Sequence, residues 1–297
     1  MSKTLRRLLL SSPILLLLIA AHLMRWDARA LLWLQEWRGA PLAATSALWL
    51  PGYRAVTQLE VPGFEKEEFS GLAYDAQSDS LFAVSGKQPL LVELSLDGKE
   101  LRRIALEGAS NLEGVAVLGD GYMAVSDERR KQLSIFRIEA ATTRVGQADI
   151  LQQVDLDIGQ DGNKGFEALT WDGRNQRLLL GTEKYPVMLY ALPVTGQRVS
   201  GALQPLTDLG GLMTDLSGLA VDPRNGQLLV LSQESHLLVG LDPQGRPRSF
   251  LALLPGLNGL RHFVPRAEGV AMDGQGTVYV VSERNLFLAL RKETEAR

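Results

Sequence analysis

The stretch "EGVAVLGDGYMAVSD", residues 113–127, contains a small apolar strand, an Asp-Gly turn and a second apolar strand. Asp-Gly and Asn-Gly pairs between apolar runs are typical of tight β-hairpins. The chain contains five copies of this unit, and we expect each copy to form a hairpin. The other copies are "SGLAYDAQSDSLFAVSG" from Ser70, "EALTWDGRNQRLLLGTE" from Glu167, "SGLAVDPRNGQLLVLSQ" from Ser217 and "EGVAMDGQGTVYVVSE" from Glu268.

The second position of every copy is a small residue, and its spacing identifies the architecture. The residues are Gly71, Gly114, Ala168, Gly218 and Gly269, separated by 43, 54, 50 and 51 positions. Periods of this length with several short strands per unit indicate propeller blades. We therefore predict an all-β protein, a β-propeller of five blades with four antiparallel strands each. Six blades remain the alternative if a degenerate blade lies in 139–165 or 255–267.

The last copy runs out before a fourth strand, whereas "RAVTQLEV", residues 54–61, precedes the first copy without a partner. We expect this early strand to complete the last blade, which also protects exposed strand edges. The propeller domain then spans residues 53–297.

An apolar run of 17 residues, Leu8–Met24, follows Lys3, Arg6 and Arg7. This length is the lower limit for a membrane-spanning helix, and a basic flank favours the cytoplasmic side. We predict a membrane anchor over residues 1–25, crossing the inner membrane once, with the propeller on the periplasmic side. A cleaved signal peptide is the alternative, with "ARA" at 28–30 as a late cleavage site.

Residues 26–52 form an amphipathic or interfacial segment and linker. Four of the five Trp residues precede residue 50, and Trp26, Ala30, Trp33 and Trp37 recur at helical spacing. Because Trp prefers the membrane–water interface, this face predicts a helix lying there. The alternative is a helix packed on the surface of the propeller.

The composition narrows the function. The chain has no Cys, which excludes disulfides, thiolate metal sites and cysteine nucleophiles. Residues 1–52 carry six Lys or Arg residues against two acidic residues, so the rest of this −3 chain carries a charge of −7. An acidic body excludes nucleic acid as the expected partner, because phosphates require a basic face.

Carboxylates recur at two repeat positions that should meet at one mouth of the central channel. Three of them open inner strands, and three stand where second strands end, beside those openings in an antiparallel hairpin. The six candidate metal ligands are Glu113, Glu167, Glu268, Asp127, Glu183 and Glu283.

Like charges about 4 Å apart repel by roughly 4 kcal/mol at an effective dielectric of 20. Such a group needs protons, basic partners or a cation. Calcium accepts six to eight oxygen ligands in irregular geometry, whereas zinc and copper favour His and Cys ligands. We therefore predict a calcium site. The alternative is a lattice of salt bridges to the flanking basic residues Lys87, Lys184, Arg266 and Arg284.

The segments "FSGLAYD", "NLEGVAV", "GFEALTWD", "LSGLAVD" and "AEGVAMD" resemble the SdiA-regulated family of bacterial membrane-associated propellers. More remotely, they are similar to phytase-like esterase and gluconolactonase-type propellers. The remote resemblance implies acidic residues and a calcium ion at the channel mouth. Carried over to this chain, it implies a metal-binding role for the six carboxylates named above. Ser70 and Ser217 stand where the other three repeats begin with Glu, so the expected site is asymmetric around the axis.

The first hypothesis is a membrane-tethered periplasmic propeller that binds calcium and a small anionic or envelope ligand. A metal-dependent hydrolase of a phosphoester or lactone is an alternative, with Glu167 or Glu268 as base. A metal-free protein-interaction scaffold is the other alternative, since a propeller fold implies no particular chemistry.

Overall fold

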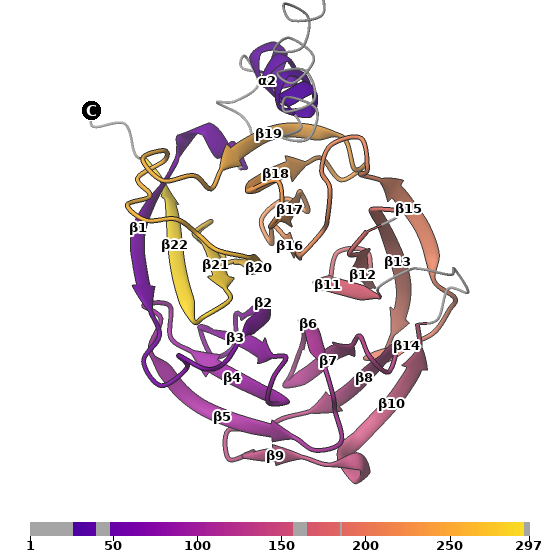
Figure 1. Cartoon of the computed structure of the whole chain (residues 1–297). Helices are drawn as coiled ribbons and strands as arrows, with labels where there is room; N and C mark the ends of the chain where they lie inside the picture. The colour runs from indigo at the N-terminus through magenta and orange to yellow at the C-terminus, as the bar shows by residue number, and fades with distance from the viewer. Residues whose placement is uncertain (1–25, 40–47, 157–164, 185, 294–297) are drawn as a thin grey trace, which may run out of the picture.

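A computed structural model describes residues 26–39, 48–156, 165–184 and 186–293 of the chain. Its strands form five sheets set around a central axis, with one inner strand of each sheet facing that axis (Figure 1). The five-bladed propeller predicted from the repeats is therefore confirmed. The segments 139–165 and 255–267 contribute no sixth blade among the described residues.

Each blade runs from an inner strand at the axis to an outer strand at the rim, and the first three blades follow in chain order. Blade 1 contains β2 (Phe69–Asp75), β3 (Ser80–Ser85), β4 (Leu90–Leu94) and β5 (Glu100–Leu106), with β9 (Arg144–Val145) parallel to β5. Blade 2 contains β6 (Leu112–Gly119), β7 (Tyr122–Asp127), β8 (Gln132–Arg137) and β10 (Ile150–Asp155). Blade 3 contains β11 (Phe166–Asp172), β12 (Arg177–Thr182), β13 (Met188–Thr195), β15 (Gln204–Asp208) and the short β14 (Arg198–Val199).

The last two blades complete the ring, and one helix and two short 3₁₀ turns accompany the described strands. Blade 4 contains β16 (Gly218–Val221), β17 (Leu228–Ser232), β18 (Leu237–Leu241) and β19 (Pro247–Ala252). Blade 5 contains β20 (Ala267–Met272), β21 (Val278–Ser282), β22 (Leu286–Lys292) and β1 (Tyr53–Glu60). The helix is α2 (Trp26–Gly39), and the 3₁₀ turns are η2 (Leu50–Gly52) and η3 (Gln147–Asp149).

The turn between β6 and β7 shows how the Asp-Gly pairs act. Asp120 and Gly121 both have positive φ, 52° and 78°, and Gly119 pairs directly with Tyr122 across the two-residue loop. This is the backbone that two-residue hairpins require. The pair at 172–173 begins a longer loop instead, because the Asp172 carboxylate accepts hydrogen bonds from Asn175 and Arg177.

The hydrophobic core of the described residues is divided into five clusters, one between each pair of neighbouring blades. Between blades 2 and 3, for example, Leu133 and Ile135 belong to the same buried cluster as Leu178 and Leu180. The alternating apolar residues of each strand face neighbouring blades, which holds the blades at fixed angles around the axis.

The ring closes as expected, because β1 pairs antiparallel with β22. The first strand of the propeller in sequence thus forms the rim of the last blade. Blade 5 is held together by residues from both ends of the propeller domain, so closure depends on a contact between distant parts of the chain.

The helix α2 lies outside the ring, beside β19 at the rim of blade 4 (Figure 1). The predicted anchor over residues 1–25 lies outside the described residues. No helix within the described ranges is long and apolar enough to cross a bilayer.

Candidate metal centre

The residues that open the inner strands lie at equivalent places in the five blades. Ser70, Glu113, Glu167 and Glu268 are each the second residue of an inner strand, and Ser217 directly precedes β16. These strands surround the axis (Figure 1). The repeat therefore sets one ring of side chains at one end of the channel.

A β-bulge positions each of the three glutamates. In blades 2, 3 and 5 the ladder between the inner and second strands shifts by one residue, and the pairing skips Glu113, Glu167 and Glu268. The extra residue of a bulge leaves the ladder and points its side chain in a new direction. This local irregularity explains how a strand with an apolar sequence presents a carboxylate at its start.

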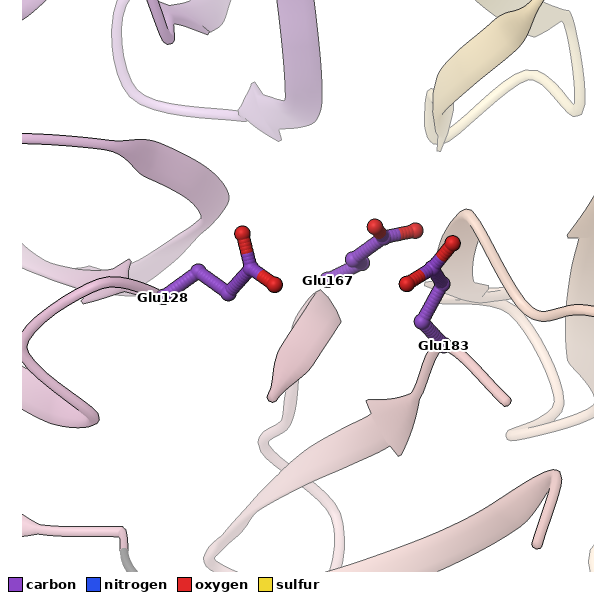
Figure 2. A group of neighbouring side chains, drawn as sticks. All are labelled: Glu128, Glu167 and Glu183. Carbon is purple, nitrogen blue, oxygen red and sulfur yellow. The ribbon is translucent and has the colours of Figure 1, made fainter. Parts of the chain in front are cut away.

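Three carboxylates form a compact group at the mouth (Figure 2). Ligand oxygens of Glu128, Glu167 and Glu183 lie within 4.8 Å of one another. Glu167 comes from β11 and lies between the other two in the view, with Glu183 directly after β12 and Glu128 directly after β7. The group therefore sits at the junction of blades 2 and 3 rather than being shared by all five blades.

Glu167 lacks a partner for one of its oxygens. Its Oε2 atom is buried and has no hydrogen-bond partner in the described part of the chain. Burial, followed by the charges of Glu183 and Glu268, raises the pKa of Glu167 to about 10. A metal-free site at neutral pH therefore holds this carboxyl in its protonated form.

The other two inner-strand glutamates lie close enough to influence the same group. Burial raises the pKa of Glu113 to about 7, although Ser70 and Asn111 donate hydrogen bonds that oppose the shift. Burial and the charge of Glu113 raise the pKa of Glu268 to about 9. Asn111 Nδ2 lies 2.7 Å from Glu113 Oε1 and 2.9 Å from Glu128 Oε2, so one amide holds two of these carboxylates.

Basic side chains reach the rim of the mouth and pair there, as the salt-bridge alternative requires. Lys87 Nζ lies 2.6 Å from Glu68 Oε1. Lys184 Nζ lies 2.5 Å from Glu234 Oε1 and 3.4 Å from Glu183 Oε1.

Arg266 forms the third rim contact, and its Nη1 lies 2.6 Å from Glu283 Oε2. Its Nε is 4.0 Å from Glu268 Oε1. Among the six predicted ligands, Glu183, Glu268 and Glu283 therefore have a basic neighbour at the rim, and Asp127 Oδ2 has Arg130 Nε at 3.8 Å. Among the described residues, Glu167 Oε2 has no such partner.

Asp127 lies outside the compact group. Its carboxylate accepts hydrogen bonds from the Ser110 N–H at 2.7 Å, the Ser110 hydroxyl at 2.9 Å and the Arg130 N–H at 3.1 Å. These bonds tie the end of β7 to the loop before β6. In blade 4 the acid lies in the loop instead. Asp215, just before β16, accepts hydrogen bonds from the Ser232 hydroxyl at the end of β17 and from the N–H groups of Gln233 and Glu234.

Glu128 joins the compact group, although the repeat alignment passes over it. It stands one residue beyond the aligned strand ends, at the position that holds Lys87, Lys184 and Arg284 in blades 1, 3 and 5 and Glu234 in blade 4. The signal in the sequence is that blades 2 and 4 place an acid where the other three blades place a base.

His262, in the loop before the last blade, lies beside the outer strand of blade 5. Its backbone exchanges hydrogen bonds with Gln58 on the outer strand β1. The loop "GQDGNKG" at 159–165 falls almost wholly outside the described residues.

The donor set suits a hard cation. Carboxylate oxygens from three side chains meet within a few ångströms, and calcium prefers such ligands. A cation there would replace the proton that the raised pKa assigns to Glu167, and would supply the missing partner of Oε2. The residues present therefore fit a calcium ion.

Comparison with known proteins agrees with the fold. The sequence model of the SdiA-regulated family matches residues 45–291. A chain in the crystal structure of a nidogen/laminin complex is similar, with a TM-score of 0.50 and 17% identity over 72% of each chain. A catalytically inactive virginiamycin B lyase from Staphylococcus aureus with quinupristin has a TM-score of 0.45 and 9% identity, over 77% of this chain and 68% of that one. At 17% identity the likeness to the nidogen/laminin chain concerns the fold alone.

Proposed function

Because this chain belongs to the SdiA-regulated family, whose sequence model matches residues 45–291, we propose a binding function for the acidic mouth of the ring. The protein is a membrane-tethered periplasmic propeller that binds calcium there, together with a small anionic or envelope ligand. Its partners are the membrane, through the N-terminal segment, and the ligand at the mouth.

The Oε2 atom of Glu167, which has no hydrogen-bond partner among the described residues, carries this proposal. A salt-bridge lattice would give each buried carboxylate a basic partner, and the rim residues do receive one. Glu167 instead lies among other glutamates, which raise its pKa. A buried acceptor without a donor costs about 1–3 kcal/mol, and a cation between the three carboxylates removes that cost.

The number of ligands supports a second component. Calcium takes six to eight oxygens, and the compact group offers three carboxylates. Glu113 and Glu268 are next in reach, since the charges of both help to raise the pKa of Glu167. The remaining positions suit oxygens of water or of an anionic ligand that enters from the open mouth.

The tether is proposed from the sequence before the propeller. The run Leu8–Met24 follows three basic residues, and only Arg25 separates it from the start of α2. A basic flank on the cytoplasmic side would place the propeller in the periplasm.

Calcium should stabilise the protein, and Glu167→Gln should remove this effect. A ligand at a hundredfold excess over its Kd adds about 2.7 kcal/mol to the free energy of unfolding. We therefore expect calcium to raise the Tm of the chelator-treated protein. The measurement is thermal unfolding with calcium and with chelator, alongside calorimetric titration.

A matched control separates this effect from damage to the fold. Glu93→Gln changes another buried glutamate, on β4, which pairs with Arg102 away from the mouth. This variant should lose stability but keep the calcium response. Equal Tm values with calcium and with chelator in the unmodified protein would leave the salt-bridge lattice as the better explanation.

A further inference from the structure

The helix α2 is apolar on two sides, and the first side fixes it to the propeller. Ala28 and Leu32 are buried, and Leu32 belongs to the core cluster between blades 3 and 4. Arg29 Nη2 donates a hydrogen bond to the Ser235 carbonyl at 2.8 Å. Glu36 Oε1 accepts one from the Phe250 N–H on β19 at 3.1 Å. The orientation of the helix on the rim of blade 4 is therefore well determined.

The second side carries tryptophan and points away from the propeller. Trp26, Trp33 and Trp37 are 51%, 60% and 66% exposed. Together with the exposed Ala30, their spacing places them along one side of the helix, away from Leu32. Exposed apolar residues elsewhere, such as Leu101 and Phe263, are spread over separate blades. A contiguous patch of large apolar side chains marks an interaction surface.

The neighbouring sequence identifies what covers this side. Only Arg25 separates the apolar run Leu8–Met24 from the start of α2. Trp is enriched where a membrane meets water, because its ring is apolar and its N–H is polar. A helix that directly follows a membrane segment and carries three such rings is suited to that boundary.

We propose that the outer face of α2, defined as Trp26, Ala30, Trp33 and Trp37, lies in the membrane–water interface and holds the propeller on its rim. This inference rests on the proposed membrane tether and is independent of calcium. Since α2 packs beside β19 at the rim (Figure 1), the bilayer meets the edge of blade 4. The acidic mouth then opens sideways into the periplasm, accessible to ligands.

The absence of cysteine allows a direct test in the full-length chain. A spin label is placed at Ala30→Cys on the outer face, or at the exposed control Leu101→Cys on β5 at the rim of blade 1. Each protein is reconstituted into nanodiscs of phosphatidylethanolamine and phosphatidylglycerol. Collision rates with oxygen, which enters lipid, and with a water-soluble nickel chelate are measured by electron paramagnetic resonance.

At position 30 we expect a severalfold fall in nickel accessibility relative to position 101, together with higher oxygen accessibility. The double substitution Trp33→Gln with Trp37→Gln should restore nickel accessibility at position 30. Flotation with vesicles reports the tether separately. The matched change Leu101→Gln should alter neither reading.

The contrary outcomes are distinguishable. Full nickel accessibility at position 30 in a chain that floats with vesicles would overturn this inference and leave the tether standing. A chain that does not float would overturn both. Low accessibility to both reagents, with spin–spin broadening, would show that a second copy of the chain covers the face, and would overturn the inference as well.

Discussion

At the scale of single residues, Glu167 combines features that are rarely left together without a ligand. It leaves the ladder through a bulge, lies between two other carboxylates and has an oxygen without a hydrogen-bond donor in the part of the chain that the structure describes. Burial alone would make its ionisation unfavourable, and the neighbouring charges add to this. The site is thus protonated or occupied by a cation, and pH distinguishes the two states.

Glu167 should make the metal-free protein less stable as pH rises. Its pKa is about 10 in the folded state against an ordinary 4.5, so between these values the folded state binds more protons than the unfolded state. Linkage then requires stability to fall with rising pH across that window, by roughly 1 kcal/mol per pH unit for one such group. Urea unfolding in chelator between pH 5 and 9 measures the slope.

Glu167→Gln should flatten this slope, and the part that remains belongs to Glu268 and Glu113, whose pKa values are also raised. Calcium should flatten it too, because the ion displaces the proton. A pH-independent stability in chelator would contradict the assignment of a protonated carboxyl at the mouth.

The candidate site was only partly predictable from the sequence, for a physical reason. Repeat symmetry locates backbone positions, so Glu113, Glu167 and Glu268 could be assigned to one ring. It does not determine where a side chain finds its hydrogen-bond donors. Asp127 is held by Ser110, whereas Glu128, one residue further, extends to Glu167.

At the scale of elements, the small residue at the second position of each repeat reflects crowding at the axis. A Cβ on Gly269 would lie 2.4 Å from the Ser70 carbonyl oxygen and 2.8 Å from the Leu72 amide nitrogen on β2. A Cβ on Gly71 would meet the Glu113 carbonyl oxygen at 2.6 Å in the same way. Adjacent inner strands approach so closely because each blade narrows toward the channel.

Gly269→Ala should therefore destabilise the propeller by about 2 kcal/mol or more, since backbone atoms must move to admit the methyl group. Gly274→Ala is the matched control, because no atom lies within 4 Å of its added Cβ. We expect that change to stay within about 0.5 kcal/mol. Urea unfolding measures both, and equal stability of the two variants would contradict close packing of the inner strands.

The elements themselves were largely predictable, because hairpins and blade order follow from local patterns. Asp120-Gly121 forms the predicted two-residue turn, and each repeat becomes one blade. The short strands β9 and β14 were not foreseen. Two residues contain no alternation to recognise, and their pairing depends on neighbouring strands that only the folded ring supplies.

At the scale of the whole molecule, the ring depends on one contact between distant parts of the chain. The four main strands of each other blade follow closely in the chain, with only the short β9, among the described strands, crossing from the chain of blade 2 to blade 1, but blade 5 needs β1 beside β22. Bringing these strands together restricts nearly the whole propeller, and the entropic cost of such closure grows with loop length. The clusters between blades 5 and 1 and between blades 4 and 5 form fully only when this contact is made.

A disulfide between β1 and β22 should therefore stabilise the ring. Thr57 and Ala289 are Cα partners on antiparallel strands, which places their Cα atoms about 4.5–5.5 Å apart, within the range for a disulfide. Oxidised Thr57→Cys with Ala289→Cys should gain about 2–4 kcal/mol over its reduced form, because the long closed loop restricts the unfolded chain.

Ser134→Cys with Gln153→Cys is the matched control, because it links paired strands within blade 2 and closes a short loop. Its gain should therefore be smaller. Urea unfolding with and without reductant measures both, and since the chain has no other cysteine, each variant contains one defined bond. An equal gain in the free energy of unfolding from both bonds would contradict the idea that the long loop between β1 and β22 limits closure of the ring. The pairing of β1 with β22 would then be as stable as the pairing of strands within blade 2.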